Sequence, residues 1–104
     1  MRAEGGGHTS VMALEVADAE SYARYRAGMA PLLAEHGGGF RYDFRVGEVL
    51  KSASEHPINR VFAIYFASRE AKDRFFADPR YLAVKKTFFE ASVGGTTIFG
   101  SYDR

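Results

Sequence analysis

The chain has 104 residues, of which 46% are hydrophobic, with six Tyr, nine Phe and no Trp; this suffices for one domain with its own core and leaves no room for a second. Its net charge of +1 gives no field that would gather nucleic acid or an anionic membrane surface. The lack of Cys excludes disulfides and thiolate sites, and the lack of an apolar leader or membrane-length apolar run predicts a cytoplasmic protein.

Residues 1–9 include three consecutive glycines and have no apolar periodicity, which predicts a flexible arm ahead of a single domain at residues 10–104. Residues 10–16 alternate between two faces and predict the first strand. Asp18 then stands at a helix N-cap position, and an apolar stripe with helical spacing follows. Pro31 within the stripe predicts a bend, and residues 37–39, all Gly, predict a left-handed end to the helix.

The next two strands differ in their pattern. Residues 40–46 alternate strictly, which predicts one dry face with Phe40, Tyr42 and Phe44 and one charged face with Arg41, Asp43 and Arg45. Residues 60–66 are apolar on both faces, as in a strand that is covered on both sides. The helices of so short a chain cover only one face, so we expect a second copy to cover the other, as in a homodimer.

The last third of the chain predicts two helical segments and a strand. Ser68 is the expected cap of the first segment, and Asp78 followed by Pro79 restarts the helix. Gly94 and Gly95 predict a break before a last strand at residues 96–102. The order strand, helix, strand, strand, helix, strand predicts an α+β, ferredoxin-like fold, in which a four-stranded antiparallel sheet carries two helices on one face.

Four short motifs give the chain a family resemblance between Val11 and Tyr102. They are Tyr22 with Tyr25, the turn His36-Gly37-Gly38, Arg60 at the start of the third strand, and Asp78-Pro79-Arg80-Tyr81. In their order and spacing they resemble the domain of unknown function 1330 family, within the dimeric α/β-barrel superfamily. The resemblance implies homodimers whose sheets pack face to face into a barrel, with a cavity between sheet and helices. Superfamily relatives include cofactor-free monooxygenases, haem-degrading enzymes and small-lactone isomerases.

Several residues are candidates for a site. His36 could act as a base near neutral pH, or its ring could cap the end of the first helix. Arg41, Asp43 and Arg45 could hold an anionic or enolisable substrate, with Asp43 moving a proton, or could form a salt-bridge ladder or a solvated face. Tyrosine hydroxyls in a cavity could bind a carbonyl, although buried tyrosines also serve the core. The candidates of this kind are Tyr25, Tyr65 and Tyr81.

Other site classes are disfavoured. The three histidines lie far apart in the sequence, so no metal is expected, and the lack of a phosphate-binding glycine loop with a following Lys disfavours a nucleotide; we therefore expect no cofactor. The third strand only partly fits the RNA-recognition consensus, and the near-zero charge argues against nucleic acid. We therefore expect a homodimer that binds a small molecule, with oxygenase or isomerase chemistry as one hypothesis. A non-catalytic dimeric interaction module is the alternative.

Overall fold

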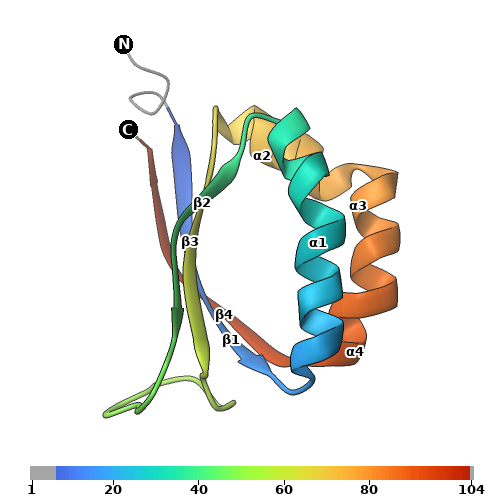
Figure 1. The fold of residues 1–104 in the computed structure, drawn as a ribbon. Coiled ribbons are helices and arrows are strands. Elements are labelled where there is room, and N and C mark those ends of the chain that lie inside the picture. The colour runs from blue at the N-terminus through green and yellow to red at the C-terminus, as the bar shows by residue number, and fades with distance from the viewer. Residues whose placement is uncertain (1–6, 104) are drawn as a thin grey trace.

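The computed structural model describes residues 7–103 and has two layers, with every helix on one side of a single sheet (Figure 1). The elements follow in the order β1 (His8–Val16), α1 (Ala19–Glu35), β2 (Gly39–Arg45), β3 (Arg60–Phe66), α2 (Arg69–Ala77), α3 (Pro79–Val84), the π-helical segment η2 (Lys85–Phe89), α4 (Glu90–Ser92) and β4 (Val93–Asp103).

The sheet has the strand order β2-β3-β1-β4, and all neighbouring strands are antiparallel. This arrangement confirms the predicted α+β fold with a four-stranded antiparallel sheet. β1 and β3 form the centre of the sheet and β2 and β4 its edges, and the helices of both crossovers pack on the same face (Figure 1). No helix within residues 7–103 is long and apolar enough to cross a membrane.

The N-terminal strand begins earlier than predicted. β1 starts at His8, and both His8 and Thr9 are buried, so these two residues of the predicted arm belong to the sheet. His8 Nδ1 lies 2.6 Å from Asp103 Oδ1 and joins β1 to the end of β4. Residues 1–6 of the predicted arm lie outside the described part of the chain.

The core lies between the sheet and the helices and is organised around β3. Phe62, Ile64 and Phe66 are buried beneath the helices, which confirms that they share one face of the strand. Phe75 of α2 is fully buried against Phe66, with ring centroids 5.5 Å apart. The opposite face of the sheet has no helix over it (Figure 1).

The predicted strict alternation of β2 is wrong. Phe40 pairs with Ile64 and Tyr42 with Ala63, so Arg41 is an extra residue in a β-bulge. Arg41 and Tyr42 therefore share the uncovered side of the sheet, whereas Asp43, opposite Phe62, lies on the helix side. After a bulge, the side chains alternate again but each points to the face opposite to the one expected. Arg41 therefore lies on the uncovered face, whereas Asp43 and Arg45 lie on the helix side.

The helix ends follow their predicted caps. The Asp18 carboxylate accepts a hydrogen bond from the Ser21 amide at 3.1 Å, and Ser68 Oγ accepts one from the Ala71 amide at 3.0 Å. Asp78 caps α3 with Pro79 at its first position, as predicted. Gly37, at φ 73°, supplies the predicted left-handed end of α1.

The predicted break at Gly94 and Gly95 is wrong, because β4 starts at Val93 and includes both residues. Glycine weakens a strand because its backbone is conformationally free and it has no side chain to pack. Here the pairing of β4 with β1 nevertheless continues through the pair Glu15 and Gly95. A register irregularity between the partners of Val11 and Met12 lies beside Gly100.

Candidate functional site

A cavity of about 240 Å³ lies between the sheet and the helices and is the candidate site. Its floor comes from the strands, with Met12, Phe40 and Phe62 among the lining residues, and its roof from α1, α3 and η2. Most of the lining is aromatic or aliphatic, with a few polar groups, which is the composition of small-molecule sites. For brevity we call it the inner cavity.

Two tyrosine hydroxyls meet in the wall of the inner cavity. Tyr25 of α1 and Tyr81 of α3 place their hydroxyl oxygens 2.8 Å apart, and both side chains are buried. Burial raises the pKa of both phenols above the ordinary value, so both hydroxyls stay protonated. A bond between two hydroxyls uses one of their two protons, and neither hydroxyl makes another hydrogen bond within residues 7–103. One O–H donor is therefore left for a ligand.

Arg26 forms a cationic wall at one end of the inner cavity. Its guanidinium lies 3.7 Å from the ring centroid of Phe40, donates to Tyr22 Oη at 3.0 Å and donates to Asp43 at 3.0 Å. Lys85 also lines the cavity, from the π-helical segment η2. Single π-turns often occur at functional sites, where they alter the direction of side chains. The cavity thus combines apolar walls with two cationic side chains and one free hydroxyl donor.

Asp43, a predicted proton carrier, lies beside the inner cavity and is held by two arginines. Arg60 binds it in a bidentate manner at 2.8 and 2.9 Å, and Arg26 adds a third contact. Hydrogen bonds from Arg60 lower the pKa of Asp43 below its ordinary value. A carboxylate so stabilised is a weak base, which suits positioning of the arginines better than proton abstraction.

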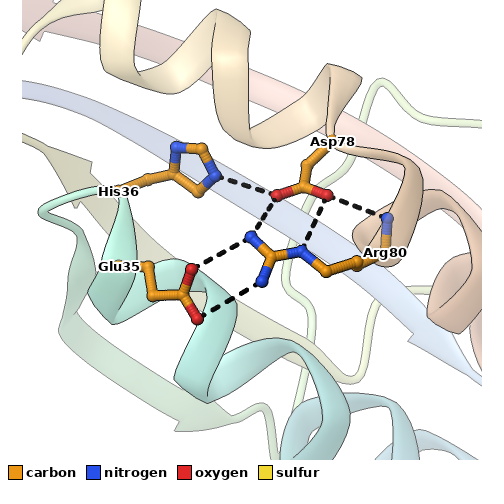
Figure 2. A network of polar contacts seen from close by, with 4 residues as sticks. All are labelled: Glu35, His36, Asp78 and Arg80. Atoms are coloured by element: carbon orange, nitrogen blue, oxygen red, sulfur yellow. Dashed lines mark hydrogen bonds and ion pairs between the residues drawn. The ribbon is translucent and has the colours of Figure 1, made fainter.

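His36, the other predicted catalytic residue, lies at the C-terminal end of α1 and does not line the inner cavity. Figure 2 shows its ring directed toward Asp78, with the two side chains joined at 3.1 Å. Arg80 binds the same carboxylate at 2.8 Å and also Glu35 at 3.0 Å. This network fastens the end of α1 to the start of α3, a structural arrangement.

The remaining predicted residues are divided between two sides of the sheet. Arg41 and Tyr65 lie on the uncovered side, where the Arg41 guanidinium is 4.7 Å from the Tyr65 ring centroid and donates to Thr9 Oγ1 at 3.2 Å. Within residues 7–103, Arg41 Nη2 is buried without a hydrogen-bond partner. Arg45 lines a second, larger and more open hollow of about 560 Å³ beside the N-terminal part of α1. Tyr22 and Arg26 line both hollows.

Sequence reasoning missed Arg26, Arg60 and Lys85 as site residues. Arg26 could have been found, because it follows Tyr22 by one helical turn and the spacing allows the observed contact. The position of Lys85 depends on the π-helical turn, which no pattern in the sequence indicates. Within residues 7–103 no three histidine, aspartate or glutamate side chains gather into a possible metal site.

Comparisons with known proteins place the chain in a structural context. The profile of the family described as domain of unknown function (DUF1330) matches residues 10–101. A comparison with curated protein sequences gave no match. A crystal structure of a protein of unknown function from Rhodopseudomonas palustris is similar, with a TM-score of 0.80 and 18% identity over 96% of this chain and 83% of that one.

Two further solved structures share the fold at greater distance. A dabb family protein with a ferredoxin-like fold from Mesorhizobium loti has a TM-score of 0.65 and 16% identity, over 93% of this chain and 95% of that one. SnoaB, a cofactor-independent oxygenase from Streptomyces nogalater, has a TM-score of 0.54 and 20% identity, over 92% and 88%. At such identities the likeness shows a common ferredoxin-like fold and leaves the activity to be argued from the site.

Proposed function

Because the chain belongs to the domain of unknown function 1330 family, whose description states no activity, its function must be inferred from its own residues, and we propose that it binds a small aromatic compound with an oxygen substituent in the inner cavity. The observation that carries this proposal is the hydroxyl pair of Tyr25 and Tyr81, which offers one unused donor inside a largely apolar enclosure.

The volume of the inner cavity limits the size of the ligand. A protein cavity of roughly 150 Å³ can hold benzene, so about 240 Å³ suits one substituted ring or two fused rings. Phe62 and Phe89 are among the lining residues, and aromatic side chains pack favourably against a flat ring. A long chain or a nucleotide is too large for this space.

The polar groups of the inner cavity favour an oxygen that carries partial or full negative charge. The free hydroxyl of the Tyr25 and Tyr81 pair donates, and the cationic side chains Arg26 and Lys85 stabilise an anion nearby. Among residues 7–103 no carboxylate lines the cavity, and Asp43 beside it is neutralised by Arg26 and Arg60. A phenol or an enol is the substituent that this arrangement fits best.

Calorimetric titration with 1-naphthol and naphthalene tests the proposal, because the two probes share a ring system and differ by one hydroxyl. We expect 1-naphthol to bind about tenfold more tightly than naphthalene, the effect of one hydrogen bond in an apolar site. The double variant Tyr25→Phe/Tyr81→Phe removes both hydroxyls and keeps the rings, so it should abolish the difference, whereas Tyr102→Phe, at a tyrosine on the uncovered side of the sheet, should keep it. Equal affinity of the wild-type protein for both probes would refute the hydroxyl's role.

Oxygenation of the bound ring without a cofactor is a second candidate function, because SnoaB is named a cofactor-independent oxygenase and shares the fold. Cationic side chains that favour an ionised ring oxygen would serve such a reaction, since electron-rich aromatic anions react with dioxygen most readily. An oxygen electrode with 1-naphthol as the probe measures it directly. Uptake that requires the protein and falls in Tyr25→Phe/Tyr81→Phe supports this function, and no uptake above the rate in buffer excludes it for this probe.

We further propose that the protein is a homodimer joined through the uncovered side of the sheet. Tyr42 and Phe44 of β2 and Tyr102 of β4 are 60%, 55% and 43% exposed there, so large aromatic side chains on both edge strands of this face are open to a partner. Arg41 Nη2, buried and without a hydrogen-bond partner among the described residues of one chain, would find an acceptor on a second copy. A ligand-free dimer with no affinity for aromatic probes would instead favour the non-catalytic interaction module.

A further inference from the structure

We propose a second binding site, for the carboxylate of a small organic acid, in the open hollow of about 560 Å³ beside the N-terminal part of α1. We call it the arginine hollow, after its lining residues Arg26, Arg45 and Arg60. It differs from the inner cavity in position, in charge and in its opening toward solvent. The inference does not depend on the proposed aromatic ligand.

Two arginines face each other across neighbouring strands at this site. Arg45 of β2 and Arg60 of β3 are directly opposed in the sheet register, on the side that faces the helices. Like charges at opposed positions of an antiparallel pair destabilise the sheet. A bound anion would relieve the repulsion, so the arrangement favours occupancy by a negatively charged group.

The positive charge of the arginine hollow is only partly balanced. Asp43 is the one acidic partner of Arg26 and Arg60, at 3.0 and 2.8 Å, and within residues 7–103 Arg45 makes no ion pair. Each guanidinium carries five N–H donors, of which Arg26 and Arg60 use two apiece in side-chain hydrogen bonds. The unused donors match the planar, bidentate geometry of a carboxylate.

The other walls of the arginine hollow indicate what kind of acid it would take. Part of its lining is apolar, so the hydrocarbon part of an organic acid can pack against it. The apolar lining residues are Val16, Ala19, Ala23 and Val46. Inorganic phosphate would bind the guanidiniums and leave these apolar side chains exposed to water. An alicyclic or aromatic acid would bind the guanidiniums and also bury the apolar side chains. The hollow therefore favours an organic carboxylate over a small inorganic anion.

Calorimetric titration with cyclohexanecarboxylate, and in parallel with inorganic phosphate, tests the site. We expect the carboxylate to bind more tightly than phosphate and its affinity to fall as salt rises, because the contacts are ionic. Arg45→Gln should weaken carboxylate binding about tenfold, the effect of one charge-assisted contact. Arg24→Gln, at a solvent-exposed arginine on α1 that pairs with Glu20, is the matched control and should leave the affinity unchanged.

A second variant acts in the opposite direction. Asp43→Asn keeps the side-chain shape but removes the internal anion, so Arg26 and Arg60 gain donors for the probe and the affinity for cyclohexanecarboxylate should rise several-fold. Equal affinity of wild-type protein and Arg45→Gln, or phosphate binding as tightly as the carboxylate, would overturn the proposal. No measurable binding of cyclohexanecarboxylate to the wild-type protein at low salt would overturn it as well.

The two proposed sites are distinguished in the same samples. Tyr81→Phe alters only the inner cavity and should leave carboxylate affinity unchanged, and saturating 1-naphthol should not displace cyclohexanecarboxylate. Failure of 1-naphthol to bind would refute the aromatic ligand and leave the carboxylate site standing. Displacement of one probe by the other would show that they occupy one site and would refute a separate arginine hollow.

Discussion

The hydroxyl oxygens of Tyr25 and Tyr81 lie 2.8 Å apart, although the two residues are 56 positions apart in the sequence. The contact joins α1 to α3 and forms part of the wall of the inner cavity. One feature thus links two helices of the helical layer and supplies the donor on which the proposed function depends.

The energetic coupling of this pair can be measured by a double-mutant cycle. Tyr25→Phe or Tyr81→Phe alone should lower the free energy of unfolding by about 1 to 2 kcal/mol, because each leaves the other hydroxyl without its partner in an apolar site. The double variant should cost less than the sum, since it removes both polar groups. Urea unfolding measures all four proteins, and strictly additive losses would contradict a direct hydrogen bond.

A tight turn after α1 makes Gly38 the most constrained glycine of that connection. A Cβ on Gly38 would lie 2.7 Å from Leu33 Cδ1 and 2.7 Å from the carbonyl oxygen of Tyr65. We expect Gly38→Ala to lower the free energy of unfolding by about 1 to 3 kcal/mol through this clash. Gly47→Ala is the matched control, because nothing lies within 4 Å of its added Cβ. If Gly38→Ala leaves the free energy of unfolding unchanged, the close packing of this turn is disproved.

The proposed dimer depends on the uncovered side of the sheet. Phe44→Glu places a charge within the expected interface and should shift the protein to monomers at micromolar concentration. Leu82→Glu makes the same chemical change at a similarly exposed residue on the helical layer and should leave the dimer intact. Sedimentation equilibrium gives the mass of each variant. A wild-type protein that sediments as a monomer would refute the interface.

The network in Figure 2 predicts a dependence of stability on acid pH. Hydrogen bonds from Arg80 and then from His36 hold the pKa of Asp78 far below its ordinary value of 3.8. Such a carboxylate stabilises the folded state fully above its ordinary pKa, and this contribution is lost progressively as the pH falls below it.

Asp78→Asn should therefore destabilise the protein at pH 6 and lose part of that difference as the pH falls from 4 toward 2. Urea unfolding at pH 6, 4, 3 and 2 supplies the comparison. Asp73→Asn, at an exposed carboxylate on α2, is the matched control for the loss of one negative charge. A constant difference between the wild-type protein and Asp78→Asn over the whole range would contradict the lowered pKa.

Local features of this fold could be predicted from the sequence. Asp18, Ser68 and Asp78 cap helices through backbone amides two or three residues away, so a short stretch of sequence contains all the required information. The two apolar faces of β3 likewise follow from simple alternation. These predictions needed no knowledge of distant parts of the chain.

Features that depend on a distant partner could not be predicted in this way. The bulge at Arg41 arises from the pairing of β2 with β3, and it reverses the face of every later residue in the strand. His36 reads as a free base near a turn, but its partner Asp78 follows 42 residues later. Tyr25 and Tyr81 were identified separately, whereas their contact needs the packing of α1 on α3.

Methionine methyl resonances give the most direct test of the central proposal, that the inner cavity binds an oxygen-bearing aromatic ring. Met12 and Met29 both line this cavity, so a titration of the protein labelled with ¹³C at the methionine methyl groups reports on it without mutation. Met12→Leu and Met29→Leu assign the signals. We expect 1-naphthol to shift both signals in a saturable manner, with larger effects than naphthalene. Unchanged Met12 and Met29 signals at concentrations of 1-naphthol that saturate the calorimetric titration would contradict binding in the inner cavity.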